Sequence, residues 1–205
     1  MLFRSYHMNN DQTRPKAPNG PLLLDDYDRE RAVAYARKWA LSRNPIFENF
    51  SGQGGDCTNF VSQAVYAGSC QMDLTKTFGW YFKSLSDRAP AWTGVDAFFD
   101  FMTGSGDFPS AVQRPGPFGY AAEREQAEIG DVVQLINSEG VAYHTLLITD
   151  LSEDGEIFVS AHTNDVLDRP LSSYENASER FIRILGVARP EGETRFDCFN
   201  LLMEG

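Results

Sequence analysis

Apolar residues recur at helical spacing early in the chain, after a polar, proline-containing beginning. The pattern predicts a helix from Asp28, whose carboxylate can accept from the unpaired N–H groups of the first turn. Asn44 should end it, because the following proline restricts that residue and lacks an N–H donor. One face of this helix is apolar and consists of Val33, Ala36, Trp39 and Ala40.

A second helix is expected directly after the glycine-rich loop in SGQGGDCTNF. Its apolar stripe contains Phe60, Val61, Ala64, Val65 and Ala67. Gly68 is a natural C-terminal cap. A third, short helix should start at Thr93, which has capping-box spacing to Asp96, and end at Gly104.

The periodicity changes from helical to two-residue in the second half of the chain. Residues 109–126 are expected to be loop, because proline and glycine punctuate them. DVVQLIN, AYHTLLIT and EIFVSAH, separated by short turns, then predict an antiparallel meander, and RFIRILGVAR predicts another strand. Helices followed by strands indicate an α+β fold whose sheet packs against the second helix.

The 205 residues suit one domain. We expect residues 1–24 to form an N-terminal arm or tail, 25–189 the folded domain and 190–205 a peripheral C-terminal tail.

Composition and charge narrow the class of protein. The hydrophobic share of 42% and the charged share of 23% are ordinary for a globular chain. A formal charge of −11 argues against nucleic acid or an anionic membrane as partner. No apolar run reaches the length of a membrane span, and the first 20 residues lack the pattern of a secretory signal, so a cytoplasmic location is expected.

The three cysteines show neither a disulfide framework nor a zinc pattern in their spacing. Their odd number leaves at least one free thiol, and Cys70 and Cys198 are expected to be inert. Cys57 differs because it follows Gly54-Gly55 at a helix start, where unpaired N–H groups and the helix dipole favour a thiolate. The same N–H groups can stabilise the oxyanion that forms when a thiolate attacks a carbonyl. Cys57 is therefore the candidate nucleophile.

Two strand histidines are candidates for the rest of the catalytic group. His144 shares a strand face with Leu146 and Ile148, and we expect this face to look toward the helices and Cys57. His162, on the next strand, is expected near His144 across the ladder, where it could orient the base. Asn164 and Asp165 are alternatives for this third role.

Other polar and aromatic residues could support such a site. Asp56 and Asn59 flank the nucleophile, and Asn164 could add a further polar contact. Trp80, Tyr81 and Trp92 belong either to the core or to a groove for a peptide or glycopeptide. A zinc site of Cys57, His144 and His162 is the alternative use of these ligand types, but no close-spaced pair anchors it, so we expect no metal and no cofactor.

Several segments, taken together, resemble the bacterial putative amidase domain family, which is grouped with the papain-like NlpC and CHAP peptidases. They are YDRERAVAYARKWALSRNPIF, GGDCTNFVSQAVYAGS, FGWYF, APAWTG, GDVVQL and HTND followed by RPLSSY. The resemblance covers about residues 27–185. It implies a papain-like fold, with the nucleophile at Cys57, the base at His144 and a polar third residue near His162. Family members are often linked to cell-wall peptides.

The resulting hypothesis is hydrolysis of an amide bond in a peptide-like substrate through a thioester. Two alternatives use the same scaffold: an acyltransferase that passes the acyl group to an amine or alcohol, and a peptide-binding module without turnover.

Overall fold

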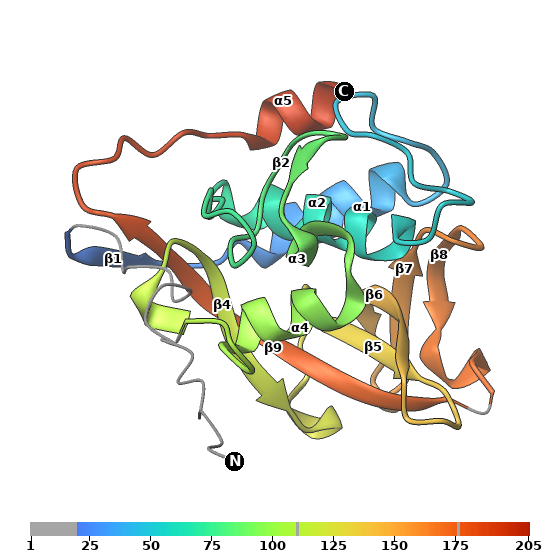
Figure 1. The fold of residues 1–205 in the computed structure, drawn as a ribbon. Coiled ribbons are helices and arrows are strands. Elements are labelled where there is room, and N and C mark those ends of the chain that lie inside the picture. Colours follow the sequence, from blue (N-terminus) through green and yellow to red (C-terminus); the bar gives the residue numbers. More distant parts are fainter. Residues whose placement is uncertain (1–19, 110, 176) are drawn as a thin grey trace, which may run out of the picture.

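A computed structural model describes residues 20–109, 111–175 and 177–205. Helices cover one face of an antiparallel sheet, so the α+β class is confirmed (Figure 1). The helices are α1 (Arg29–Trp39), α2 (Asp56–Ser69), α3 (Pro90–Thr93), α4 (Val95–Thr103) and α5 (Phe199–Glu204), with short 3-10 helices at Ala111–Gln113, Arg124–Gln126 and Leu171–Ser173.

The main sheet has the strand order β1-β9-β5-β6-β7-β8, with β4 also paired to β9. Its strands are β1 (Leu22–Asp25), β4 (Gly116–Ala122), β5 (Val132–Ile136), β6 (Ala142–Leu151), β7 (Ile157–Ala161), β8 (Val166–Pro170) and β9 (Ser178–Pro190). A separate ribbon pairs β2 (Phe82–Ser84) with β3 (Asp87–Arg88). The predicted meander is confirmed, because β5, β6 and β7 are antiparallel neighbours.

Two apolar clusters form the core. In the first, Phe60 and Val61 of α2 pack with Leu147 of β6 between the helices and the sheet. The second gathers residues from the same strands but contains no residue of α1 or α2, and its members include Leu135, Leu146 and Ile148. Because side chains alternate along a strand, the two clusters lie on opposite faces of the sheet.

Helix α1 begins as the sequence predicts. Asp28 Oδ1 accepts a hydrogen bond of 3.0 Å from Arg31 N, which is the N-cap contact. The helix ends at Trp39, before the predicted end at Asn44. Asn44 instead directs its side chain to the following turn, where Oδ1 accepts from Ile46 N, and to α5, where Nδ2 donates to Leu202 O.

Helix α2 runs past the predicted cap at Gly68. Cys70 takes the left-handed C-cap conformation, with φ 47°. Gly68 lies within the helix at a close approach to the chain before α1, because a Cβ there would meet the Tyr27 ring at 2.5 Å and Asp28 O at 2.6 Å. The glycine therefore permits helix packing rather than helix termination.

The third helix also starts differently from the prediction. Thr93 closes α3, and α4 begins at Val95 after Gly94, which provides no side-chain cap. Asp96 bonds to Arg180 of β9 at 2.7 Å, so the predicted capping box does not form. The predicted loop at 109–126 contains β4, whose pairing partner, β9, is about 60 residues distant and invisible to a local pattern.

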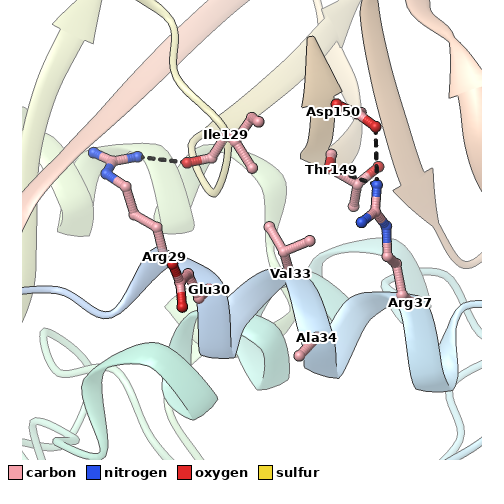
Figure 2. A pocket seen from close by; sticks show the side chains of 8 residues that line it. All are labelled: Arg29, Glu30, Val33, Ala34, Arg37, Ile129, Thr149 and Asp150. Atoms are coloured by element: carbon pink, nitrogen blue, oxygen red, sulfur yellow. Dashed lines mark hydrogen bonds and ion pairs between the residues drawn. The ribbon is translucent and has the colours of Figure 1, made fainter.

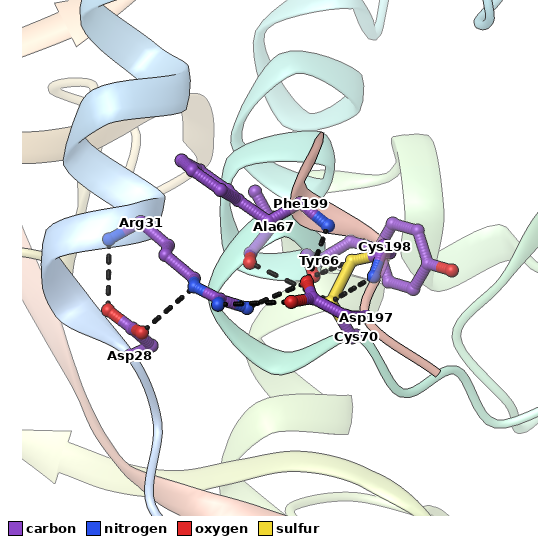
Figure 3. Close-up of a disulfide and its surroundings, with 8 residues drawn as sticks. All are labelled: Asp28, Arg31, Tyr66, Ala67, Cys70, Asp197, Cys198 and Phe199. Carbon is purple, nitrogen blue, oxygen red and sulfur yellow. Dashed lines mark hydrogen bonds and ion pairs between the residues drawn. A yellow bond between two sulfur atoms is a disulfide. The ribbon is translucent and has the colours of Figure 1, made fainter. Parts of the chain in front are cut away.

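A disulfide joins Cys70, at the end of α2, to Cys198, at the start of α5 (Figure 3). The spacing of the cysteines gave no sign of a disulfide, because spacing along a sequence does not reveal a pairing across 128 residues. The segment predicted as a C-terminal tail carries α5, whose Leu202 O accepts from Trp39 Nε1 at 3.2 Å. At the other end, β1 gives part of the predicted arm a place in the sheet, beside β9. Residues 1–19, with His7, lie outside the described residues.

None of the helices in the described ranges has the length and apolar character needed to cross a bilayer. The expected cytoplasmic location stays a prediction, and the disulfide weighs against it, since such bonds are typical of oxidising compartments.

Candidate active site

Cys57 is the second residue of α2 and the one cysteine outside the disulfide. Only 4% of its surface is exposed. The residue before the helix, Gly55, has φ 110°, and a Cβ there would lie 2.9 Å from Thr93 O. A side chain at position 55 would thus meet both backbone strain and a clash, which explains the glycine of GGDC.

The helix start offers donors around the sulfur. The first α-helical hydrogen bond runs from Asn59 N to Gly55 O, so the N–H groups of the three preceding residues lack a partner in the helix ladder. Their positive potential favours anions, either a thiolate or a developing oxyanion. The local setting expected for a nucleophile is present.

A hydrogen bond ties this helix start to the strand of His144. Thr58 Oγ1 lies 2.9 Å from Thr145 Oγ1, and both side chains are fully buried. Thr145 Oγ1 also accepts from Gln134 Nε2 at 3.1 Å, which fixes its position on the sheet. Since Cys57 precedes Thr58 and His144 precedes Thr145, the two candidates are chain neighbours of side chains in direct contact.

His144 is buried, with 8% of its surface exposed, between aromatic rings. Its ring centroid lies 6.3 Å from those of Tyr143 and Tyr174. Burial lowers the pKa of His144 to about 4, and the positive charge of Arg169 adds to the lowering. At neutral pH the imidazole is therefore uncharged and able to accept a proton.

The orientation of His144 differs from the prediction. It does share a face with Leu146 and Ile148, but that face belongs to the second cluster, whereas Thr145 faces α2. Alternation identifies which residues share a face but not which face the helices cover when both are buried. Within the described residues no hydrogen bond joins Cys57 to His144, and the sulfur contacts Thr58 Oγ1 at 3.8 Å.

His162 lies on the helix-facing side, against α2. Its Nδ1 is 3.1 Å from Asp56 Oδ2, its Nε2 is 2.9 Å from Trp39 O, and its ring stacks on Phe60 at 4.1 Å. The expectation that it lies beside His144 is therefore wrong: Ser160 opposes Leu147, which brings His162 to the level of Thr145. The imidazole is held by the nucleophile's own helix.

Asp56 is fully buried and gathers donors from several segments. It accepts from Phe50 N, Ser51 Oγ and Asn59 Nδ2, each at 3.1 Å, and lies 3.0 Å from Arg43 Nε. Burial alone would raise the pKa of this carboxyl, but the contacts with His162, the Phe50 amide and Asn59 outweigh it and hold the pKa well below its usual range.

The charge of Asp56 is consequently compensated. An isolated carboxylate one residue from Cys57 would oppose thiolate formation by like-charge repulsion. Arg43 Nε lies 3.0 Å from Asp56 Oδ2, and His162 Nδ1 lies 3.1 Å from the same oxygen. The helix start therefore keeps its positive character beside the sulfur.

The remaining candidates play lesser parts. Asn59 Nδ2 also donates to Glu48 O, and its Oδ1 accepts from Trp92 Nε1, so it anchors the loop before the helix. Asp165 binds Arg43 at 2.8 Å and thereby joins the Asp56 cluster. Asn164 has φ 63°, lies in the β7–β8 turn and is exposed. Arg43 was not predicted to belong to the site, because no local sequence pattern distinguishes it.

The aromatic residues of the predicted groove lie in the core. Trp80 and Trp92 are fully buried, with ring centroids 4.8 Å apart. A groove of about 550 Å³ does lie between α1 and the sheet (Figure 2), and its lining includes none of the candidate catalytic residues. Its two arginines are paired within the protein: Arg29 with Asp131 and Arg37 with Asp150.

The alternative zinc site is not formed. Across the ranges that the structure describes, no three histidine, cysteine or carboxylate side chains are arranged to hold a metal ion. Cys57, His144 and His162 instead have separate surroundings.

Comparison with known proteins identifies the family of this chain. The family model of the putative amidase domain matches residues 26–185, more than three quarters of the chain. This chain belongs to that family, whose name indicates an amidase-type hydrolase.

Two relatives come from Bacillus subtilis (strain 168). The chain is 30% identical over 155 residues to the uncharacterized protein YhbB, covering 74% of this chain and 46% of that protein. It is 26% identical over 152 residues to the uncharacterized protein YjcM, covering 70% of this chain and 32% of that protein. The chain thus spans less than half the length of either relative. No solved structure matches it.

Proposed function

We propose that this domain is a papain-like, cysteine-dependent amidase that hydrolyses an amide bond in a peptide-like substrate through a thioester. Cys57 is the nucleophile and His144 the base. The amidase family supports the hydrolytic class, and the glycine-to-helix junction supports the nucleophile.

The observation that carries the proposal is the contact between Thr58 and Thr145. It places the start of α2 against β6 at the residue next to His144, whose own side chain lies on the other face of that strand, and Gln134 holds the strand side of the contact. The neutral state of His144 matches the role of a base, since its lone pair is available at neutral pH.

The chemistry follows from these roles. His144 takes the proton of the Cys57 thiol, and the sulfur attacks the amide carbon, forming a C–S bond while the carbonyl electrons move to oxygen. The N–H groups at the start of α2 stabilise this oxyanion. Collapse breaks the C–N bond, and the proton returns from His144 to the leaving amine. Water then attacks the thioester carbon and loses a proton to His144. The C–S bond breaks, the acid leaves, and the proton passes from His144 to the sulfur of Cys57.

In this proposal His162 and Asp56 are positioning residues. They connect the end of α1, through Trp39 O, to the first residue of α2. Their contacts fix the approach of the glycine loop and neutralise the carboxylate beside the sulfur. His162 therefore acts on Cys57 through its helix, and not on the ring of His144.

The test compares wild type with Cys57→Ser and His144→Gln on a library of peptides and peptidoglycan fragments, read by mass spectrometry. New amine and acid termini should appear with wild type and vanish with both variants. Iodoacetamide at neutral pH should label native wild type at Cys57. A Cys57→Ser protein that cuts the same bonds as wild type would overturn the proposal.

The same assay separates the alternative functions. Added hydroxylamine would trap a hydroxamate from any thioester, and transfer to the amines of the library without hydrolysis would favour the acyltransferase. Binding of library members without any covalent change, equal in wild type and Cys57→Ser, would favour the binding module.

A further inference from the structure

Arg169 of β8 lies beside the proposed base and has a guanidinium with free donors. Its Nε donates to Ser173 Oγ at 2.7 Å, and Nη2 donates to Ser173 O at 3.2 Å. A guanidinium carries five N–H donors, and these two bonds leave the others available. In the described part of the chain, no carboxylate forms an ion pair with it.

Most arginines of the described residues are held differently, although Arg88, Arg114 and Arg195, like Arg169, form no ion pair with a carboxylate. Eight arginines of the described residues pair with carboxylates: Arg29, Arg31, Arg37, Arg43, Arg124, Arg180, Arg183 and Arg189. A chain with net charge −11 has many acidic partners to offer. The guanidinium of Arg169 is therefore positioned by a hydroxyl and a carbonyl, which orient it without cancelling its charge.

The ring of Tyr174 connects Arg169 to the proposed base, His144. The guanidinium carbon lies 4.2 Å from the ring centroid of Tyr174, and that ring lies 6.3 Å from the His144 ring. Arg169 opposes Val159, a member of the second cluster, so it shares the sheet face of His144. Tyr143, the residue before His144, is 49% exposed, and its ring centroid lies 6.3 Å from that of the imidazole.

The charge of Arg169 opposes catalysis unless an anion joins it. Positive charge disfavours the imidazolium that His144 becomes when it takes the thiol proton. A bound carboxylate would cancel this effect and also occupy the free N–H donors in the bidentate geometry that arginine favours.

On the basis of the proposed function, we propose that Arg169 binds a carboxylate of the substrate beside His144. The enzyme would thus select acidic peptides whose free carboxylate lies close to the scissile amide. Tyr174 orients the guanidinium and supplies an apolar surface to the neighbouring part of the substrate.

The test is an internal competition with matched peptide pairs, read by mass spectrometry. Each pair differs only in a carboxylate, as glutamate against glutamine or a free terminus against its amide. Wild type should cut the carboxylate member about tenfold faster, the gain typical of a charge-assisted contact. Arg169→Gln should remove this preference while still cutting the neutral member, and Arg169→Lys should retain part of it.

The controls separate failure of this inference from failure of the proposed function. Arg195→Gln, which changes an exposed arginine near the disulfide, should leave the preference intact. A midpoint of urea unfolding equal to that of wild type verifies that each Arg169 variant is folded. Equal cutting of both members by wild type, or an unchanged preference in Arg169→Gln, would overturn the inference. Cleavage of neither member by wild type would instead count against the amidase itself.

Discussion

His162 Nδ1 lies 3.1 Å from Asp56 Oδ2, with both side chains almost completely removed from solvent. This pair links the end of β7 to the first residue of the helix that carries Cys57. The other ring nitrogen, Nε2, lies 2.9 Å from Trp39 O, so the imidazole also contacts the end of α1. Three segments distant in sequence thus meet immediately behind the proposed nucleophile.

Removing the charge of Asp56 should destabilise the protein. Asp56→Asn leaves Arg43 and His162 without their buried partner, and the free energy of unfolding should fall by about 3 kcal/mol. Urea denaturation at pH 7 measures the change. Asp165→Asn, which alters the more exposed partner of Arg43, serves as the matched control and should cost less than about 1 kcal/mol. Similar losses in the two variants would contradict the compensated-charge account.

His144 should make the fold sensitive to mild acid. Its pKa is lowered to about 4 by burial first and Arg169 second, so between about pH 6.5 and pH 4 the unfolded chain binds a proton that the folded chain does not. Stability from this group is therefore present above that window and is lost as the pH falls through it, by about 2 to 3 kcal/mol in total.

The measurement compares wild type with His144→Gln in urea at several pH values. The difference between their free energies of unfolding should change across this window. Titrations of the other groups are common to both proteins and cancel. A constant difference from pH 7 to pH 4 would mean that His144 titrates normally.

Loss of the disulfide should weaken the attachment of α5. The double variant Cys70→Ser/Cys198→Ser should unfold with a free energy lower by about 3 to 5 kcal/mol, because the bond closes a loop of more than 100 residues in the unfolded chain. A phosphine reductant should lower the stability of wild type by a similar amount and leave the variant unchanged. An effect of reductant on the variant would point to another cause.

Gly55 should be required for two reasons, its positive φ and the lack of space for a side chain. Gly55→Ala and Gly52→Ala both place a side chain at positive φ, which costs about 1 kcal/mol or more. Only the Cβ at position 55 meets an atom, Thr93 O at 2.9 Å. Gly55→Ala should thus be the less stable variant and should slow iodoacetamide labelling of Cys57. Equal behaviour of the two variants would exclude the clash as the reason for the glycine.

Local patterns predicted the parts of the fold whose causes are local. The cap at Asp28 depends on residues three positions apart, and the meander depends on short turns between alternating strands. The glycine pair before Cys57 likewise predicts that a helix starts within a few residues.

The errors concern relations between distant segments. Both sheet faces are buried, so alternation could group His144 with Leu146 but could not tell which face the helices cover. The contact between His162 and Asp56 was not predicted, because an aspartate at the start of a helix is common for local reasons alone. The disulfide and the position of Arg169 beside His144 could not be predicted, because the spacing of residues along the sequence contains no information on either.

The bond between Cys70 and Cys198 divides the covalent chain into a closed ring and two open ends. Cys57 belongs to the N-terminal end, whereas His144 and His162 belong to the ring. A protease that cuts once between residues 71 and 197 therefore yields two pieces that travel as one band on a non-reducing gel, while a cut between Cys57 and Cys70 frees the nucleophile's fragment even without reductant.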